Sequence, residues 1–87
     1  MKGIITVIGY DKVGIIAKIC MFLSESGINV LDISQTIVQG FFNMLMIVDM
    51  TDKEFSEIDA HLQNLGEEIG VSVKLQSEEI FNAMHRI

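Results

Sequence analysis

The chain is poor in several residue types that particular functions require. Among its 87 residues are one cysteine, one arginine and no proline. A single cysteine permits no internal disulfide, cannot hold an iron–sulfur cluster and suits a reducing compartment, so we expect a cytoplasmic protein. Six basic residues against twelve acidic ones give a net charge of −6, which disfavours nucleic acid and anionic membrane surfaces as partners.

Long apolar runs are also missing. No stretch approaches the ~20 apolar residues that span a bilayer, because Lys18 interrupts the longest candidate. The N-terminus passes directly into an expected strand, which leaves no room for a signal peptide. Hydrophobic residues nevertheless make up 49% of the chain, which predicts one folded domain over residues 1–87.

Hydrophobic periodicity predicts the order βαββαβ followed by a short helix. The expected strands cover residues 2–8, 28–39, 41–50 and 71–75, and the expected helices cover residues 15–23 and 55–69, with a short helix after Ser77. Right-handed crossovers fold this order into an α+β ferredoxin-like sandwich, with a four-stranded antiparallel sheet and two helices on one face.

Local signals set the expected ends of these elements. Gly27 and Gly70 are typical left-handed helix stops, and Gln39-Gly40 predicts a tight turn between two strands. The spacing of Thr51-Asp52-Lys53-Glu54 predicts a capping box for the second helix, and Ser77 is expected to cap the last one. Gly66 inside the second helix costs about 1 kcal/mol relative to alanine, and the sequence does not explain it.

Residues for catalysis or metal binding are scarce. Cys20 lies on an apolar helix stripe and is expected to be an inert core residue, while His61 is expected on the surface and His85 near the C-terminus. No two of these three have metal-ligand spacing, and the acidic residues lack the density of a calcium loop. An acylphosphatase would need an arginine in the first loop, which has none. We therefore expect no enzyme activity, no metal and no cofactor.

One constellation suits a ligand that carries both a carboxylate and an ammonium. A strand, a turn bounded by Gly9 and Gly14, an amphipathic helix and a strand entry at Gly27-Ile28-Asn29 follow one another. The turn is expected to bring backbone N–H groups at the helix start near the Asn29 amide. Each residue also has a purely structural interpretation: Gly9 permits a tight turn, Gly14 permits close packing, and Asn29 tolerates a left-handed backbone.

The runs I-T-V-I-G-Y-D-K-V-G-I-I-A-K-I and F-L-S-E-S-G-I-N-V-L-D-I-S-Q resemble the ACT domain family, the small-molecule-sensing modules of amino-acid metabolism. They are similar to the regulatory domains of formyltetrahydrofolate deformylase and the glycine-cleavage repressor, and to short bacterial proteins made of one such domain. The resemblance covers residues 3–77. It implies dimerisation and a ligand cleft at the dimer interface, between the first loop and the start of the second strand. The implied ligand-binding positions are Asp11, Lys12, Val13, Gly14, Ile15 and Asn29.

Two positions depart from the family pattern, since many members have proline where Val13 stands and some place histidine where Gly9 stands.

We predict a regulatory domain, not an enzyme, that binds a small amino acid or related metabolite as a homodimer. The alternative is a ligand-free interaction module that docks on a metabolic enzyme or regulator. The second strand carries only Asp32 as a charge and has no proline, so we expect it and the first helix to form the dimer contact.

Overall fold

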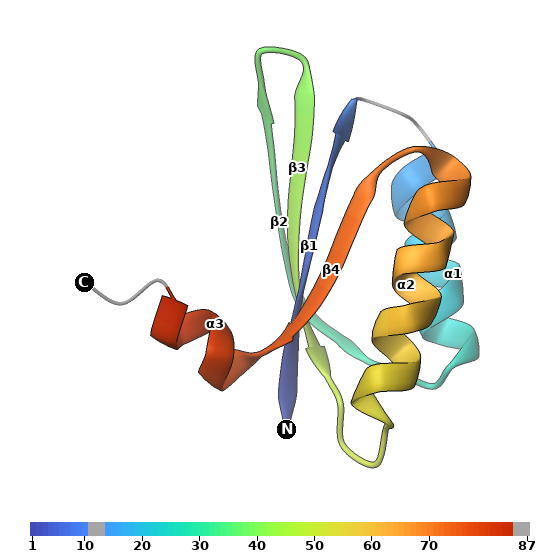
Figure 1. The fold of residues 1–87 in the computed structure, drawn as a ribbon, viewed down its shortest axis with the longest axis vertical. Coiled ribbons are helices and arrows are strands. Elements are labelled where there is room, and N and C mark those ends of the chain that lie inside the picture. The colour runs from blue at the N-terminus through green and yellow to red at the C-terminus, as the bar shows by residue number, and fades with distance from the viewer. Residues whose placement is uncertain (11–13, 85–87) are drawn as a thin grey trace.

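The computed structural model describes residues 1–10 and 14–84. Its elements are β1 (Lys2–Tyr10), α1 (Gly14–Glu25), β2 (Val30–Val38), β3 (Phe41–Asp49), α2 (Phe55–Ile69), β4 (Ser72–Ser77) and α3 (Glu78–Met84). The strands pair antiparallel in the order β2-β3-β1-β4. Figure 1 shows α1 and α2 together on one face of this sheet and α3 on the other. The predicted ferredoxin-like fold with a short C-terminal helix is confirmed.

The hydrophobic core lies between the sheet and the two long helices. Alternate residues of the central strands and one stripe of each helix supply it, as the periodicity predicts. The buried members include Ile5, Val7, Ile15, Ile19, Leu23, Met44, Met46, Val48 and Leu62. The methionines of β3 are therefore core residues, as predicted.

The strand ends differ by a few residues from the expected ones. β1 continues to Tyr10 instead of ending at Ile8, because β3 offers pairing partners as far as Phe41. β2 covers only Val30–Val38, and Ile28 is instead a buried residue that packs in the core. Gln39 and Gly40 both have positive φ, which confirms the predicted two-residue turn.

The capping box predicted at Thr51 is wrong. α2 begins at Phe55, with Glu54 at the N-cap and no side-chain cap hydrogen bond. The Thr51 hydroxyl instead donates to Asp49 Oδ1 at 2.6 Å, and the Thr51 amide donates to the same oxygen at 2.9 Å. These bonds hold the pKa of the Asp49 carboxyl below its usual value. The Asp49 carboxylate, two residues before Thr51, therefore accepts the two hydrogen bonds that close the turn after β3.

The other predicted helix ends are confirmed. Gly27 and Gly70 have left-handed backbones, and Ser77 Oγ accepts a hydrogen bond from the Ile80 amide at 3.2 Å. Gly66, which the sequence did not explain, lies against the chain that enters β4. A Cβ there would lie 2.8 Å from the Val71 carbonyl oxygen, so only glycine lets the helix approach so closely.

Candidate functional site

Strand β2 forms one edge of the sheet and is exposed along its whole length. Its register pairs Ile33 with Met46 and Ile37 with Phe42, so these isoleucines lie on the helix-bearing face. Their partners are buried, yet Ile37 is 62% exposed because no helix of the described chain covers this strand. An unprotected edge with apolar side chains is an association surface in most sheets.

The opposite edge, strand β4, is better protected. The Leu75 amide of this strand donates to Asp59 Oδ1 of α2 at 3.2 Å, so a side chain occupies a donor that an added strand would need. Helix α2 also packs along β4. Of the two sheet edges, β2 is therefore the one open to pairing, as the sequence predicted.

A hollow of about 240 Å³ lies where β2 begins, and we call it the α1–β2 hollow. The last turns of α1 and the chain entering β2 line it, namely Cys20, Leu23, Ser24, Gly27, Ile28, Asn29 and Val30. Cys20 is half-buried and not fully enclosed, so its side chain borders this hollow as well as the core. The sequence did not single out Ser24, although Cys20 and Ser24 are four residues apart and share a helix face.

A hydrogen bond holds the backbone of Asn29 in place, whereas its side chain is exposed. Its carbonyl oxygen accepts a hydrogen bond from the Asp49 amide at 2.9 Å, next to the pairing of Asp49 with Lys2. Asn29 therefore lies at the end of the sheet where β1 starts. Its φ is not positive, so a left-handed backbone does not explain the residue.

Gly14 lies at the other end of the sheet. Tyr10 pairs with Phe41, and Phe41 pairs with Val38, so β1 ends at the same end of the sheet as β2. Helix α1, about 18 Å long from its twelve residues, separates Gly14 from Asn29. Figure 1 shows this directly, with the start of α1 and the start of β2 at opposite ends. The expectation that the turn brings the amides at the helix start near Asn29 is therefore wrong for a single chain.

The two glycines of the first turn have different environments. A Cβ on Gly9 would clash with Val71 Cγ1, so the Val71 side chain fills the space that a side chain at this position would need. A Cβ on Gly14 would meet no atom of the described residues within 4 Å, and Gly14 has no left-handed backbone. Gly9 therefore lies within β1 and makes room for Val71 instead of forming the expected tight turn, and the close packing expected at Gly14 is not found, since Gly14 is exposed.

The remaining predicted positions of the first turn contribute unequally. Ile15 is 1% exposed and packs in the core, so only its backbone can face a ligand. The amides of a first helical turn have no acceptor within the helix, which makes them donors for an anion. Asp11, Lys12 and Val13 lie outside the described residues.

Other chemistry-bearing residues give no alternative site. Within residues 1–10 and 14–84 no three His, Cys, Asp or Glu side chains gather as metal ligands, and no helix there is long and apolar enough to cross a bilayer. His61 is exposed, as predicted, and its ring stacks on Phe22 with centroids 5.7 Å apart. His85 lies outside the described residues.

The sequence pattern of the ACT domain matches residues 3–76. The chain belongs to the ACT domain family. A UPF0237 protein of Bifidobacterium longum is 57% identical over 99% of this chain and 98% of its own length. A solved ACT domain protein from Streptococcus pneumoniae is 38% identical, with a TM-score of 0.84 over 98% of both chains. The ligand-free regulatory subunit of aspartate kinase from Thermus thermophilus is 30% identical, with a TM-score of 0.69 over 88% of this chain and 51% of its own.

These matches confirm the resemblance that the two sequence runs predicted. A formyltetrahydrofolate deformylase structure from Burkholderia mallei shares the fold as well, at 12% identity and a TM-score of 0.77 over 87% of this chain and 28% of its own. ACT domains are regulatory ligand-binding domains, so membership assigns this chain to a regulatory class and indicates no catalytic family.

Proposed function

We propose that this ACT domain is a homodimeric sensor that binds a small amino acid or a related metabolite between two protomers. The observation that carries the proposal is the separation of Gly14 from Asn29 along α1, combined with the open β2 edge between them. Each chain holds two halves of one ligand site at opposite ends of the same exposed strand. Only a second chain can join them.

A two-fold axis through the β2 edge supplies this juxtaposition. Two copies of one strand that pair about such an axis run antiparallel. The end of β2 near Val38 then lies beside the partner's β2 start near Val30. Because Gly14 belongs to the first end and Asn29 to the second, each helix start approaches the α1–β2 hollow of the other protomer. A symmetric dimer therefore contains two equivalent composite sites.

The chemistry of each half suits one end of an amino acid. The amides and dipole of the first turn of α1, from Gly14, favour a carboxylate. The Asn29 side-chain oxygen accepts a hydrogen bond from an ammonium, and its exposed position leaves it available. The missing side chain at Gly14 lets the ligand or the partner backbone come close without a clash. The family resemblance adds Asp11, Lys12 and Val13, which lie outside the described residues, to the proposed binding positions.

Such a site couples the ligand to the dimer. A metabolite that binds only where two chains meet stabilises the paired state by mass action, by about 2.7 kcal/mol at a hundred times its dissociation constant. The regulated protein would then respond to the amount or geometry of the dimer. The isolated ACT domain needs no chemistry of its own for this role.

A thermal-shift screen against the common amino acids, nucleotides and folates tests the proposal. We expect a concentration-dependent rise in melting temperature for one class of amino acid. Asn29→Ala should then weaken binding by about 10- to 150-fold in calorimetry, since a hydrogen bond to a charged group contributes about 1.5–3 kcal/mol. Ser34→Ala, at an exposed polar position within β2, is the matched control and should bind normally.

Two results would contradict the proposal. One is a protein that stays dimeric and shows no stabilisation by any compound, which would favour the ligand-free interaction module instead. The other is a ligand that Asn29→Ala binds unchanged while both proteins remain folded dimers, because the site would then lie elsewhere.

A further inference from the structure

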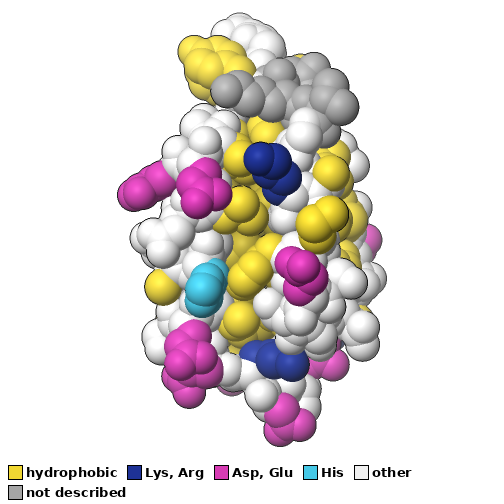
Figure 2. All heavy atoms as spheres, turned by 90° about the vertical axis from the view of Figure 1, so that its right-hand side faces the viewer, with side chains coloured by type: hydrophobic (Ala, Val, Ile, Leu, Met, Phe, Trp, Pro, Cys, Tyr) yellow, Lys and Arg dark blue, Asp and Glu magenta, His cyan; other side chains and the backbone are white. Residues whose placement is uncertain are grey.

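A groove of about 460 Å³ runs between α1 and α2 on the outer side of the helix layer, away from the sheet, and we call it the α1–α2 groove. Figure 2 looks onto this face and shows an apolar strip between the two helices with acidic side chains on both sides. It lies apart from the α1–β2 hollow and from the proposed ligand site. Nothing in the sensing mechanism uses it.

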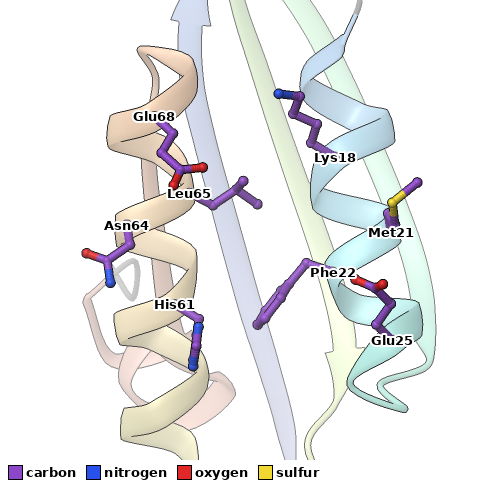
Figure 3. A pocket seen from close by; sticks show the side chains of 8 residues that line it. All are labelled: Lys18, Met21, Phe22, Glu25, His61, Asn64, Leu65 and Glu68. Carbon is purple, nitrogen blue, oxygen red and sulfur yellow. The ribbon is translucent and has the colours of Figure 1, made fainter.

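The floor of the groove is apolar and held in place from below. Phe22 and Leu65 are half-buried and pack against the core, and Figure 3 shows both side chains directed into the space between the helices. Met21 is 63% exposed beside them, and the His61 ring covers part of Phe22. Aromatic and methionine side chains on a supported base are typical of surfaces that accept apolar side chains from a partner.

Acidic residues surround this floor. Glu25 of α1 and Glu68 of α2 line the groove from opposite helices, and Lys18 is the one lysine among its described lining residues. The two helices and the residues 51–54 that lead into α2 carry seven carboxylates against two lysines. These are Glu25, Asp52, Glu54, Glu57, Asp59, Glu67 and Glu68 against Lys18 and Lys53. The helix layer therefore favours a partner with basic side chains.

The groove stays accessible in the proposed dimer because α1 uses a different face there. Lys18, Met21, Phe22 and Glu25 follow the spacing of one helix stripe and line the groove. Cys20 and Ser24 lie on the face toward β2 and line the α1–β2 hollow. A dimer formed through β2 would thus carry two open grooves on one helix layer.

We propose that the α1–α2 groove docks a basic amphipathic helix of the protein that this domain regulates. Apolar side chains of that helix contact Phe22, Met21 and Leu65, while its lysines or arginines contact Glu25 and Glu68. The proposal rests on the proposed regulatory function, since a regulatory domain must contact its target, and it assigns that contact to a surface separate from the metabolite site.

Labelled synthetic peptides test this docking on the full chain. The probe is an amphipathic helix of about 18 residues made of leucine and lysine with one tryptophan, long enough to follow α2. Its controls are a peptide with glutamate in place of lysine and one with the same composition in a non-amphipathic order. Fluorescence anisotropy should show binding of the first peptide alone, weakening as salt is raised. Amide shifts in NMR spectra should fall on the groove stripes of α1 and α2.

Charge reversals locate the contact. Glu25→Lys/Glu68→Lys should weaken peptide binding about tenfold, because two attractions become repulsions at the rim. Glu67→Lys/Glu79→Lys makes the same change in net charge outside the groove and should leave affinity within about threefold. Met21→Ser, at an exposed position, should weaken binding without changing the melting temperature.

Three outcomes would overturn the docking proposal: no binding of the basic peptide at low salt, equal losses in both charge-reversal variants, or amide shifts on the open sheet face or the β2 edge. Failure of the metabolite-site proposal can be distinguished from failure of the docking proposal, because different variants test the two sites. Asn29→Ala should weaken metabolite binding about 10- to 150-fold and leave peptide affinity unchanged, whereas Glu25→Lys/Glu68→Lys should weaken peptide binding and leave metabolite affinity unchanged.

Discussion

Ile37→Lys should separate the proposed dimer into folded monomers. Ile37 lies at the open β2 edge and is 62% exposed, so the monomer loses little when it changes. Full burial of an isoleucine contributes about 1.5–3 kcal/mol, and the fraction left to bury in a dimer contributes about 1–2 kcal/mol per protomer. A two-fold interface uses the residue twice, which gives about 2–4 kcal/mol per dimer.

That loss corresponds to a rise of roughly 30- to 900-fold in the dimer dissociation constant. The added charges increase it further, because each lysine must be desolvated or expelled from the interface. Sedimentation equilibrium over a concentration series measures the constant directly. Circular dichroism of dilute samples checks that the variant keeps its helices and strands.

Thr36→Lys is the matched control, because Thr36 is an exposed neighbour on the same strand whose side chain faces the opposite side of the sheet. It introduces the same charge outside the expected helix-side contact and should sediment as the wild type does. An interface on the helix side of β2 would be refuted if Ile37→Lys left the dimer dissociation constant unchanged. It would also be refuted if Thr36→Lys raised that constant as much as Ile37→Lys does.

Three further predictions concern single residues. Gly66→Ala should lower stability by about 1–2 kcal/mol in urea unfolding, since overpacking against Val71 outweighs the ~1 kcal/mol gain in helix propensity; a stabilised variant would contradict the close approach. Gly14→Ala should unfold within about 0.5 kcal/mol of the wild type, because its Cβ meets open space, while metabolite binding weakens; a large loss of stability would reveal a packing role. Asp49→Asn should be less stable than the wild type at neutral pH. Because the folded pKa of Asp49 is lowered, this difference should shrink as the pH falls below about 4, and a pH-independent difference would contradict the Thr51 hydrogen bonds.

The sequence predicts most of the fold because its signals are local. Alternation sorts β3 into a buried face with Met44 and Met46 and an outer face with Leu45, as the register confirms. Gly27 and Gly70 end their helices because a left-handed residue is needed there. The predicted cap at Thr51 fails for an equally local reason, since Asp49 competes for the same hydroxyl.

Local sequence signals do not predict contacts between segments that are far apart in the chain. Gly9 and Gly66 both make room for Val71, and neither requirement is visible in the residues beside them. The candidate site could have been predicted better, because a helix of twelve residues between Gly14 and Asn29 already keeps them about 18 Å apart. The sequence pattern of one chain does not predict how a second protomer would bring the two halves of the proposed site together.

Mixed dimers test the composite site most directly. Gly14→Asp and Asn29→Ala each damage a different half, so each homodimer should bind the metabolite found in the thermal-shift screen weakly or not at all. If each site takes Gly14 from one protomer and Asn29 from its partner, the mixed dimer contains one intact site and one doubly damaged site. Calorimetry on the purified mixed dimer should then show near-wild-type affinity at one ligand per dimer. A mixed dimer that binds no better than its parents would contradict a site shared between the two chains.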